Sequence, residues 1–134
     1  MEKVRKLSLA VALLFCLSGC QKTEKPVSHL VTSVEVTCYH NNEVLTRNYE
    51  KSQKISAVLY YLRTQVYRGK AEINPEGLPG DKFSIILRYS DGHCDKIFQR
   101  ANRYISRNYH TWQEIEEKPA SKLYPLLLAV PGDL

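Results

Sequence analysis

The sequence lacks the short motifs that mark the common enzyme and metal sites. It contains no Gly-x-Ser-x-Gly nucleophile motif and no phosphate-binding loop, since its 6 glycines are in turns. The four histidines, His29, His40, His93 and His110, are scattered, and neither H-x-x-x-H nor C-x-x-C spacing occurs. These absences argue against the usual hydrolase and metalloenzyme classes. We therefore expect no catalytic residue, no metal and no cofactor, in a protein that is not an enzyme.

Strong charge and long apolar runs are also missing. The chain has 19 Lys and Arg against 14 Asp and Glu, and its formal net charge of +5 is mild for a nucleic-acid-binding protein. The longest apolar run, residues 7–17, is interrupted only by Ser8 and is shorter than the about 20 residues that cross a bilayer. Internal repeats and low-complexity tracts are absent. The sequence predicts one domain with no nucleic-acid partner.

The first residues have the order of an export signal. Basic residues lie between positions 3 and 6, the apolar run follows, and the small pair Ser18-Gly19 precedes Cys20. The stretch Leu17-Ser18-Gly19-Cys20 resembles the lipobox of bacterial lipoproteins. The resemblance implies cleavage after a signal peptide of residues 1–19 and acylation of the Cys20 thiol. The protein would then be held in the cell membrane, on its extracytoplasmic face, by that lipid. The alternative is an ordinary secretory signal that ends in cysteine.

The next residues predict a tether. Residues 21–29 are polar, contain one proline and show no apolar period, so we expect residues 20–32 to be a tether that joins the lipid to a domain at residues 33–134. Cys38 and Cys94 fall in this domain, in a compartment that permits disulfides. The residues leave two alternatives open, which are one Cys38–Cys94 disulfide or two buried free thiols.

The periodicity of the domain predicts an α+β fold. Residues 33–40 and 44–49 alternate as a hairpin around Asn41-Asn42-Glu43. A helix follows from an N-cap at Ser52, with one apolar face that runs from Ile55 to Val66 and an end near Gly69. The predicted order is β-β-α-β-β-β-β-α, with an antiparallel sheet of hairpins packed on one amphipathic helix.

The second half of the chain supplies the other predicted strands. A two-residue turn at Asp91-Gly92 would pair residues 83–90 with those that follow, placing Arg88 opposite Asp95 and Lys96 on the core side. Two alternatives follow for Lys96: it lies near the sheet edge and extends its amine to solvent, or the register slips at a bulge. Residues 104–106 and 111–115 predict a further hairpin. A last helical segment opens at Lys118 and is kinked or restarted by Pro125.

The domain is similar to small uncharacterised lipoproteins of Firmicutes. The similarity rests on the single amphipathic helix, Leu78-Pro79-Gly80-Asp81, Tyr89-Ser90-Asp91-Gly92, the segment from Arg103-Tyr104 to Trp112, and Leu123-Tyr124-Pro125-Leu126-Leu127. It implies the same fold and location, and it brings no activity with it.

Basic and aromatic residues are concentrated between positions 100 and 112. Such side chains are enriched at binding hot spots and also bind sugars, phosphates and carboxylates. The candidate binding surface consists of Arg100, Arg103, Arg107, Tyr109 and Trp112. In the alternative interpretation Tyr104 and Trp112 are core residues and the arginines form a solvated face. Tyr60, Tyr61 and Tyr67 form a weaker candidate.

These observations predict a non-catalytic binding domain. Its expected partner is an envelope protein or an anionic wall polymer, in addition to the membrane reached through Cys20. A second hypothesis is an inhibitor or immunity-type module that plugs an enzyme. A third is an enzyme with an unfamiliar site, which would need a deep pocket with convergent His and carboxylate groups.

Overall fold

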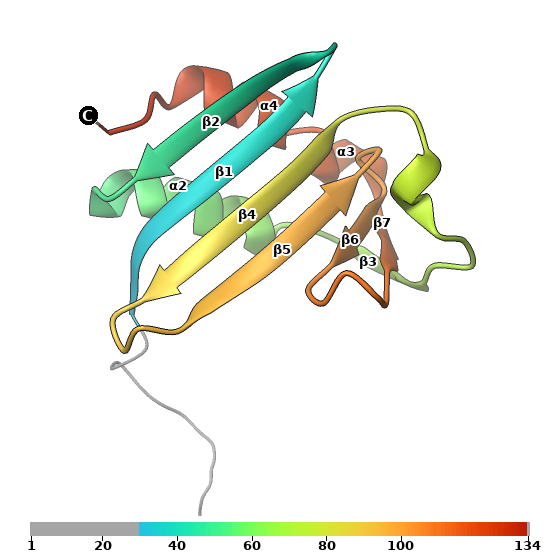
Figure 1. Ribbon diagram of the computed structural model, residues 1–134, viewed down its shortest axis with the longest axis horizontal. Coiled ribbons are helices and arrows are strands. Elements are labelled where there is room, and N and C mark those ends of the chain that lie inside the picture. Colours follow the sequence, from blue (N-terminus) through green and yellow to red (C-terminus); the bar gives the residue numbers. More distant parts are fainter. Residues whose placement is uncertain (1–29, 134) are drawn as a thin grey trace, which may run out of the picture. The chain divides into compact units, whose positions relative to one another are not determined.

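The computed structural model describes residues 30–133 (Figure 1). The predicted signal peptide, the lipobox with Cys20 and most of the predicted tether lie outside the described residues. The first strand begins at Val31, so the folded part starts slightly before the predicted boundary at residue 33.

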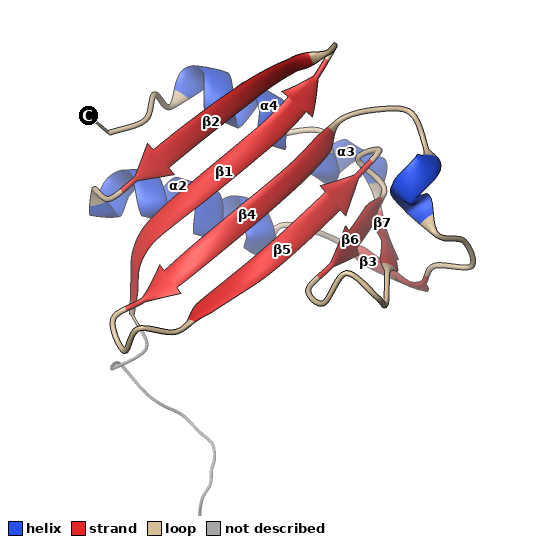
Figure 2. Cartoon of the chain, in the orientation of Figure 1, coloured by secondary structure: helices blue, strands red, loops and turns tan. Residues whose placement is uncertain are grey.

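A single antiparallel sheet with helices on one side forms the fold, which confirms the predicted α+β class. Seven strands are arranged in the order β2-β1-β4-β5-β6-β7-β3. They are β1 (Val31–His40), β2 (Glu43–Tyr49), β3 (Tyr67–Lys70), β4 (Lys82–Tyr89), β5 (Cys94–Arg100), β6 (Tyr104–Ser106) and β7 (Gln113–Ile115). The helices are α2 (Ser52–Arg63), the 3₁₀ turn η3 (Pro75–Gly77), α3 (Glu117–Ala120) and α4 (Leu123–Ala129). Helices α2, α3 and α4 lie behind β2-β1-β4-β5 in Figure 2, and the front of these strands is open.

The β1–β2 hairpin confirms the predicted alternation. Val34, Val36 and Cys38 of β1 point into the core. Asn41 and Asn42 form the turn with φ values of 50° and 65°. Asparagine tolerates this left-handed conformation, which a tight hairpin turn requires at both central residues.

Helix α2 is shorter than the apolar period predicts. Ile55, Val58 and Tyr61 are its buried residues, and the helix ends at Arg63. Val66 was expected on the buried face but is 45% exposed. Its carbonyl instead accepts the N–H of Glu116 at 2.9 Å, because the chain has already left the helix toward β3 at the edge of the sheet. The prediction missed β3 and was wrong to extend the helix toward Gly69.

The pairing of β4 with β5 differs by one residue from the predicted register. Arg88 lies opposite Cys94 instead of Asp95. The connecting turn is longer than two residues: Gly92, at a φ of 98°, donates its N–H to the carbonyl of Tyr89 at 3.0 Å. A type I turn followed by a left-handed glycine adds a residue to the loop and shifts the pairing.

This shift reverses the faces of β5. Ile97 and Gln99 are buried in the core, whereas Lys96 is exposed on the open face. The core position of Lys96 in the two-residue-turn register is therefore wrong, and of the two alternatives for Lys96 the structure contains the shifted register. Arg88 forms its ion pair with Glu35 of β1, at 3.2 Å, and not with Asp95.

The two cysteines of the domain carry free thiols. Cys38 is buried opposite Phe83, and Cys94 is exposed opposite Arg88. Phe83 and Arg88 are near opposite ends of β4, so the cysteines are too far apart for the short Cα–Cα distance of a disulfide. Of the two predicted alternatives the structure contains free thiols, and only that of Cys38 is buried.

The last helices cover the sheet without a break at proline. Leu123 and Leu127 of α4 are fully buried in the core. Pro125 lies in the first turn of α4, where backbone N–H groups have no partner within the helix. The predicted interruption of the helical segment therefore lies before Pro125, between the end of α3 at Ala120 and the start of α4 at Leu123.

Asp133 near the C-terminus fixes the start of helix α2. No side chain caps this helix, and the predicted N-cap Ser52 is its first helical residue. The Asp133 carboxylate instead accepts the N–H groups of Glu50 and Lys51, the two residues before the helix, and forms an ion pair with Lys54 of its first turn at 3.0 Å. These hydrogen bonds, with the charge of Lys54, lower the pKa of Asp133 to about 2.

Replacing Asp133 with asparagine is expected to lower the melting temperature at pH 7. An aspartate with a lowered native pKa stabilises the fold above its unfolded pKa, near 3.9, and loses this effect as pH falls through the native value. The difference between wild type and D133N should therefore shrink between about pH 4 and pH 2. Thermal denaturation followed by circular dichroism measures it, with the exposed Glu43→Gln as control. Equal melting temperatures at pH 7 would contradict this stabilising role of Asp133.

Candidate functional site

Arg100 belongs to the interior of the domain and not to its surface. The residue is 8% exposed. Its Nε donates to the Glu76 carboxylate at 3.2 Å, and its Nη1 donates to the carbonyls of Phe83 and Gln99 at 3.2 and 3.1 Å. Its Nε and Nη1 groups are used in these bonds, so Arg100 holds the sheet against η3.

Trp112 and Tyr109 pack beside this arginine. The guanidinium carbon lies 5.7 Å from the ring centroids of both. Trp112 is 7% exposed, whereas Tyr109 is 41% exposed and meets Trp112 edge to face at 5.7 Å. A hydrogen bond from Tyr109 and the charge of Arg100 hold the pKa of Glu76 below its ordinary value. The core interpretation is therefore right for Trp112.

Arg103 is exposed, but its charge is balanced. Its Nη2 donates to Glu114 Oε2 at 3.0 Å across the β6–β7 hairpin. An exposed pair of this kind contributes little stability and leaves little net charge for a ligand. The predicted surface is thus divided, and Arg107 is its remaining exposed arginine.

A dense set of hydrogen bonds fixes the loop that carries Arg107. Asn108 Oδ1 accepts the N–H groups of His110 and Thr111, both at 2.8 Å. Ser106 Oγ donates to the Thr111 carbonyl at 2.7 Å and accepts the N–H of Tyr109 at 2.9 Å. These local bonds are typical of Asx and Ser turns, and they set the backbone of the loop before any ligand binds.

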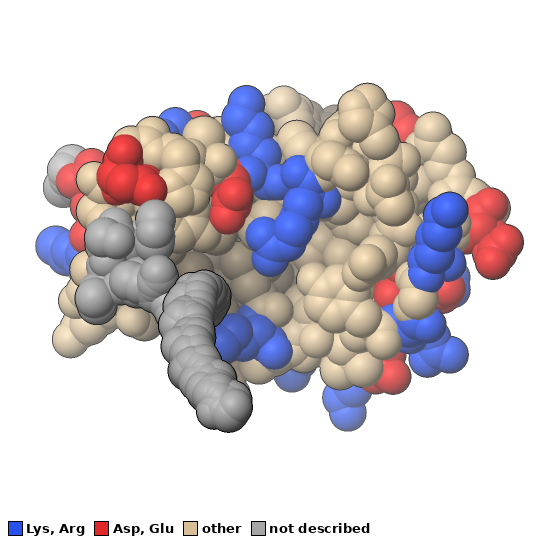
Figure 3. All heavy atoms as spheres, turned by 90° about the horizontal axis from the view of Figure 1, so that it is seen from below, with Lys and Arg blue, Asp and Glu red and all other residues tan. Residues whose placement is uncertain are grey.

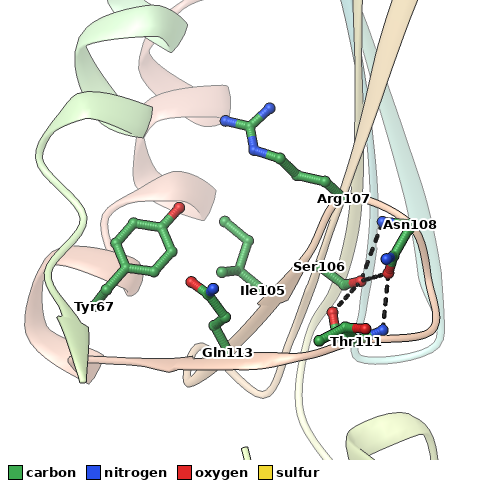
Figure 4. Close-up of a pocket in the computed structure, with 7 residues that line it drawn as sticks. All are labelled: Tyr67, Ile105, Ser106, Arg107, Asn108, Thr111 and Gln113. Carbon is green, nitrogen blue, oxygen red and sulfur yellow. Dashed lines mark hydrogen bonds between the residues drawn. The ribbon is translucent and has the colours of Figure 1, made fainter. Parts of the chain in front are cut away.

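The fixed loop borders a hollow of about 490 Å³ at the end of the sheet, which we call the hairpin hollow. It is lined by Tyr67, Ile105, Ser106, Arg107, Asn108, Thr111 and Gln113. Figure 4 shows the side chains of Tyr67, Gln113 and Arg107 around the buried Ile105, with the tyrosine hydroxyl turned toward the guanidinium. The side chains of Ser106 and Asn108 are used within the loop. The side-chain donors that remain for a ligand come from Tyr67, Arg107, Thr111 and Gln113.

The charge of the hairpin hollow is positive. Arg107 is exposed, and within residues 30–133 no carboxylate lies within ion-pair distance of it. The residues that line the hollow include no Asp or Glu. Figure 3, which views the molecule from below, shows Lys and Arg side chains gathered beside a recess in the middle of that face. The arrangement favours an anionic ligand with hydroxyl groups.

A pair of ionisable side chains that the sequence did not suggest lies at the end of β1. His40 Nδ1 is 2.7 Å from Asp81 Oδ1, and the imidazole ring stacks on Tyr124 at 3.9 Å. Cys38 is two residues earlier on the same strand face, so a Cys-His-Asp set is brought to one region. The residues are far apart in sequence, and no spacing rule would have found them.

This set is not a nucleophile site. Burial, together with the nearby Asp81, raises the pKa of Cys38 to about 12, so its thiol stays protonated at neutral pH. His40 Nε2 faces the side chain of Asn41 at 3.1 Å. A buried, protonated thiol has neither the charge nor the access that attack on a substrate requires.

Comparison of the chain with protein-family models, with curated proteins and with solved structures gave no match. Within residues 30–133, no group of three or more His, Cys, Asp or Glu side chains is arranged to hold a metal ion. In the same part of the chain, no helix combines the length and the apolar character that a bilayer crossing needs.

Proposed function

We propose that this protein is a lipid-anchored extracytoplasmic lipoprotein whose domain binds an anionic wall polymer without catalysis. The observation that carries the binding function is the hairpin hollow, in which exposed Arg107 stands with Tyr67 and Gln113 around an apolar floor. The lipid on Cys20 comes from the lipobox resemblance. It would keep the domain close to the membrane, where such polymers are attached.

A phosphate-bearing polyol suits this hollow chemically. A guanidinium offers several N–H donors to a phosphate oxygen, and a charge-assisted contact is about twice as strong as a neutral hydrogen bond. Tyr67 and Gln113 supply further hydrogen-bonding groups for hydroxyls. Because the loop is held by its own bonds, little ordering entropy is lost on binding.

Replacing Arg107 with alanine is expected to weaken binding to poly(glycerol phosphate) by about tenfold, since a hydrogen bond to a charged group contributes roughly 1.5–3 kcal/mol. The full-length protein, solubilised in detergent, is titrated with this polymer and with neutral dextran. Binding by wild type should weaken as salt is raised. A Cys20→Ser variant, which cannot carry the lipid, should in addition leave the membrane fraction.

Arg103→Ala is the matched control, because its guanidinium lies on the same hairpin but is paired with Glu114. It should bind the polymer nearly as well as wild type. Equal loss in R107A and R103A, or no binding of the polymer by wild type, would refute the proposal. Recovery of one stoichiometric hydrolase from solubilised membranes, with no polymer binding, would support the inhibitor hypothesis instead.

A further inference from the structure

The open face of the sheet carries a second hollow, which we call the sheet-face hollow. It has a volume of about 380 Å³ and is lined by Tyr39, Lys82, Ser84, Phe98, Arg100 and Tyr109. This volume falls in the range of small-molecule sites, about 300–1,000 Å³. Its residues Tyr39, Ser84 and Phe98 alternate along their strands with buried core residues, so the hollow lies on the side of β1, β4 and β5 that faces away from the core. Figure 2 shows the helices on the other side of these strands.

Strand register explains how the aromatic side chains come together. Tyr39 of β1 pairs with Lys82 of β4, and Ser84 of β4 pairs with Phe98 of β5. Tyr39 and Phe98 therefore stand two strands apart and two residues out of register, so that Lys82 and Ser84 of β4 lie between them. Tyr109 meets Phe98 edge to face at 4.9 Å and extends the wall on that side.

The aromatic walls of the sheet-face hollow are accessible to solvent, and its charged lining residues are all basic. Tyr39 is 53% exposed, a high value for a tyrosine on a sheet. The lining contains no carboxylate, and the charge of Arg100 is offset by Glu76 outside the hollow. Lys82 is also close enough to Glu76 to lower its pKa, but no ion pair within the described residues holds its ammonium group.

We infer that the sheet-face hollow binds a pyranose ring that carries an anionic substituent. The C–H face of a sugar stacks on tyrosine and phenylalanine rings, while its hydroxyls reach Ser84 and its anionic group reaches Lys82. A flat aromatic ligand would satisfy the walls but would leave Ser84 without a partner. This site and the hairpin hollow share no lining residue, and the inference does not depend on the proposed function.

The single tryptophan of the chain provides a reporter for this inference. Trp112 is in ring contact with Tyr109, so a ligand that stacks on Tyr109 should change its emission. The full-length protein in detergent is titrated with oligogalacturonate and with neutral maltohexaose of the same length. The inference requires a saturable change with oligogalacturonate and at least tenfold weaker binding of maltohexaose.

Two variants and a control complete the experiment. Tyr39→Ala should weaken oligogalacturonate binding at least tenfold, and Lys82→Met should remove the preference over maltohexaose. Tyr60→Ala changes a tyrosine on α2 that is 64% exposed, against 53% for Tyr39, and this variant should bind as wild type does. Circular dichroism melts establish that each variant is folded.

The outcomes separate this site from the hairpin hollow. R107A should bind oligogalacturonate normally, and Y39A should bind poly(glycerol phosphate) normally. Unchanged oligogalacturonate affinity in both Y39A and K82M, or equal affinity of wild type for the two oligosaccharides, would overturn the inference.

Discussion

Replacing Arg100 with methionine is expected to lower the free energy of unfolding by about 3 kcal/mol, since the carbonyls of Phe83 and Gln99 lose a donor and a buried acceptor left unpaired costs roughly 1–3 kcal/mol. Glu76 adds little to this loss, because its side chain is 42% exposed and regains water when it loses its partner. Methionine keeps much of the side-chain volume, so the loss measures the polar contacts more than the packing.

The contacts of Arg100 connect three parts of the fold. The guanidinium bonds to Glu76 of η3, to the Phe83 carbonyl of β4 and to the Gln99 carbonyl of β5. It also lies over the rings of Tyr109 and Trp112. Loss of the charge should therefore loosen the loop after β6, and the emission of Trp112 should shift to the red in R100M under native conditions.

Urea denaturation of full-length wild type and R100M, followed by circular dichroism, gives the free energies. Arg103→Met is the control, because it removes a pair of the same type on the surface, where such pairs contribute about 0.2–1 kcal/mol. A loss below about 1 kcal/mol in R100M, or equal losses in the two variants, would show that Arg100 is not a structural residue.

The spacing of apolar residues along the sequence predicted the strands and helices that have one buried face. The alternation of Val34, Val36 and Cys38 predicted β1, and the apolar period predicted α2 up to Arg63. The α+β class followed from these elements. The apolar pattern did not predict β3. This segment has no buried residue, and it is a strand because it pairs with β7.

The β4–β5 register shows how one turn decides a whole face. The sequence Asp91-Gly92 is compatible with a two-residue turn and with a longer turn that ends in a left-handed glycine. Because strand side chains alternate, the extra residue exchanges Ile97 for Lys96 in the core. The improbable burial of Lys96 in the predicted register was the signal that favoured the longer turn.

Prediction of the candidate site was limited because its residues contact side chains that are distant in the sequence. Residues 100–112 are basic and aromatic, and the hairpin hollow does lie at this hairpin. Sequence spacing did not separate Arg100 from Arg107, since burial of Arg100 depends on Glu76 in a loop before β4. The tyrosine that completes the hollow, Tyr67, was assigned to a helix and belongs to β3.

Replacing Tyr61 with phenylalanine is expected to lower the free energy of unfolding by about 2 kcal/mol, as for other buried groups that lose a hydrogen-bond partner. The Tyr61 hydroxyl lies 2.5 Å from Gln99 Oε1 and 3.0 Å from the Ala120 carbonyl. Gln99 is fully buried, and its Nε2 donates to the Ala120 carbonyl and to Asn102 at 3.2 Å. In Y61F the Oε1 atom of Gln99 loses the hydrogen bond that the Tyr61 hydroxyl donates, and because Gln99 is fully buried no water can replace it.

These bonds join α2, β5 and the end of α3, so they fix how the helices sit on the sheet. Burial raises the pKa of Tyr61, so the hydroxyl remains a donor throughout the neutral range. Tyr60→Phe is the matched control, because the neighbouring tyrosine is exposed and its hydroxyl makes no hydrogen bond with the described residues. Y60F should unfold as wild type does.

A double-mutant cycle with Gln99→Leu tests whether Tyr61 and Gln99 act as one unit. If they do, the double variant should be less destabilised than the sum of Y61F and Q99L, by about 1 kcal/mol, because each single change leaves the other group unpaired. Additive losses would mean that the two residues contribute separately. In that case the Ala120 carbonyl, which both of them face, would be the group whose hydrogen bonding holds α3 to the sheet.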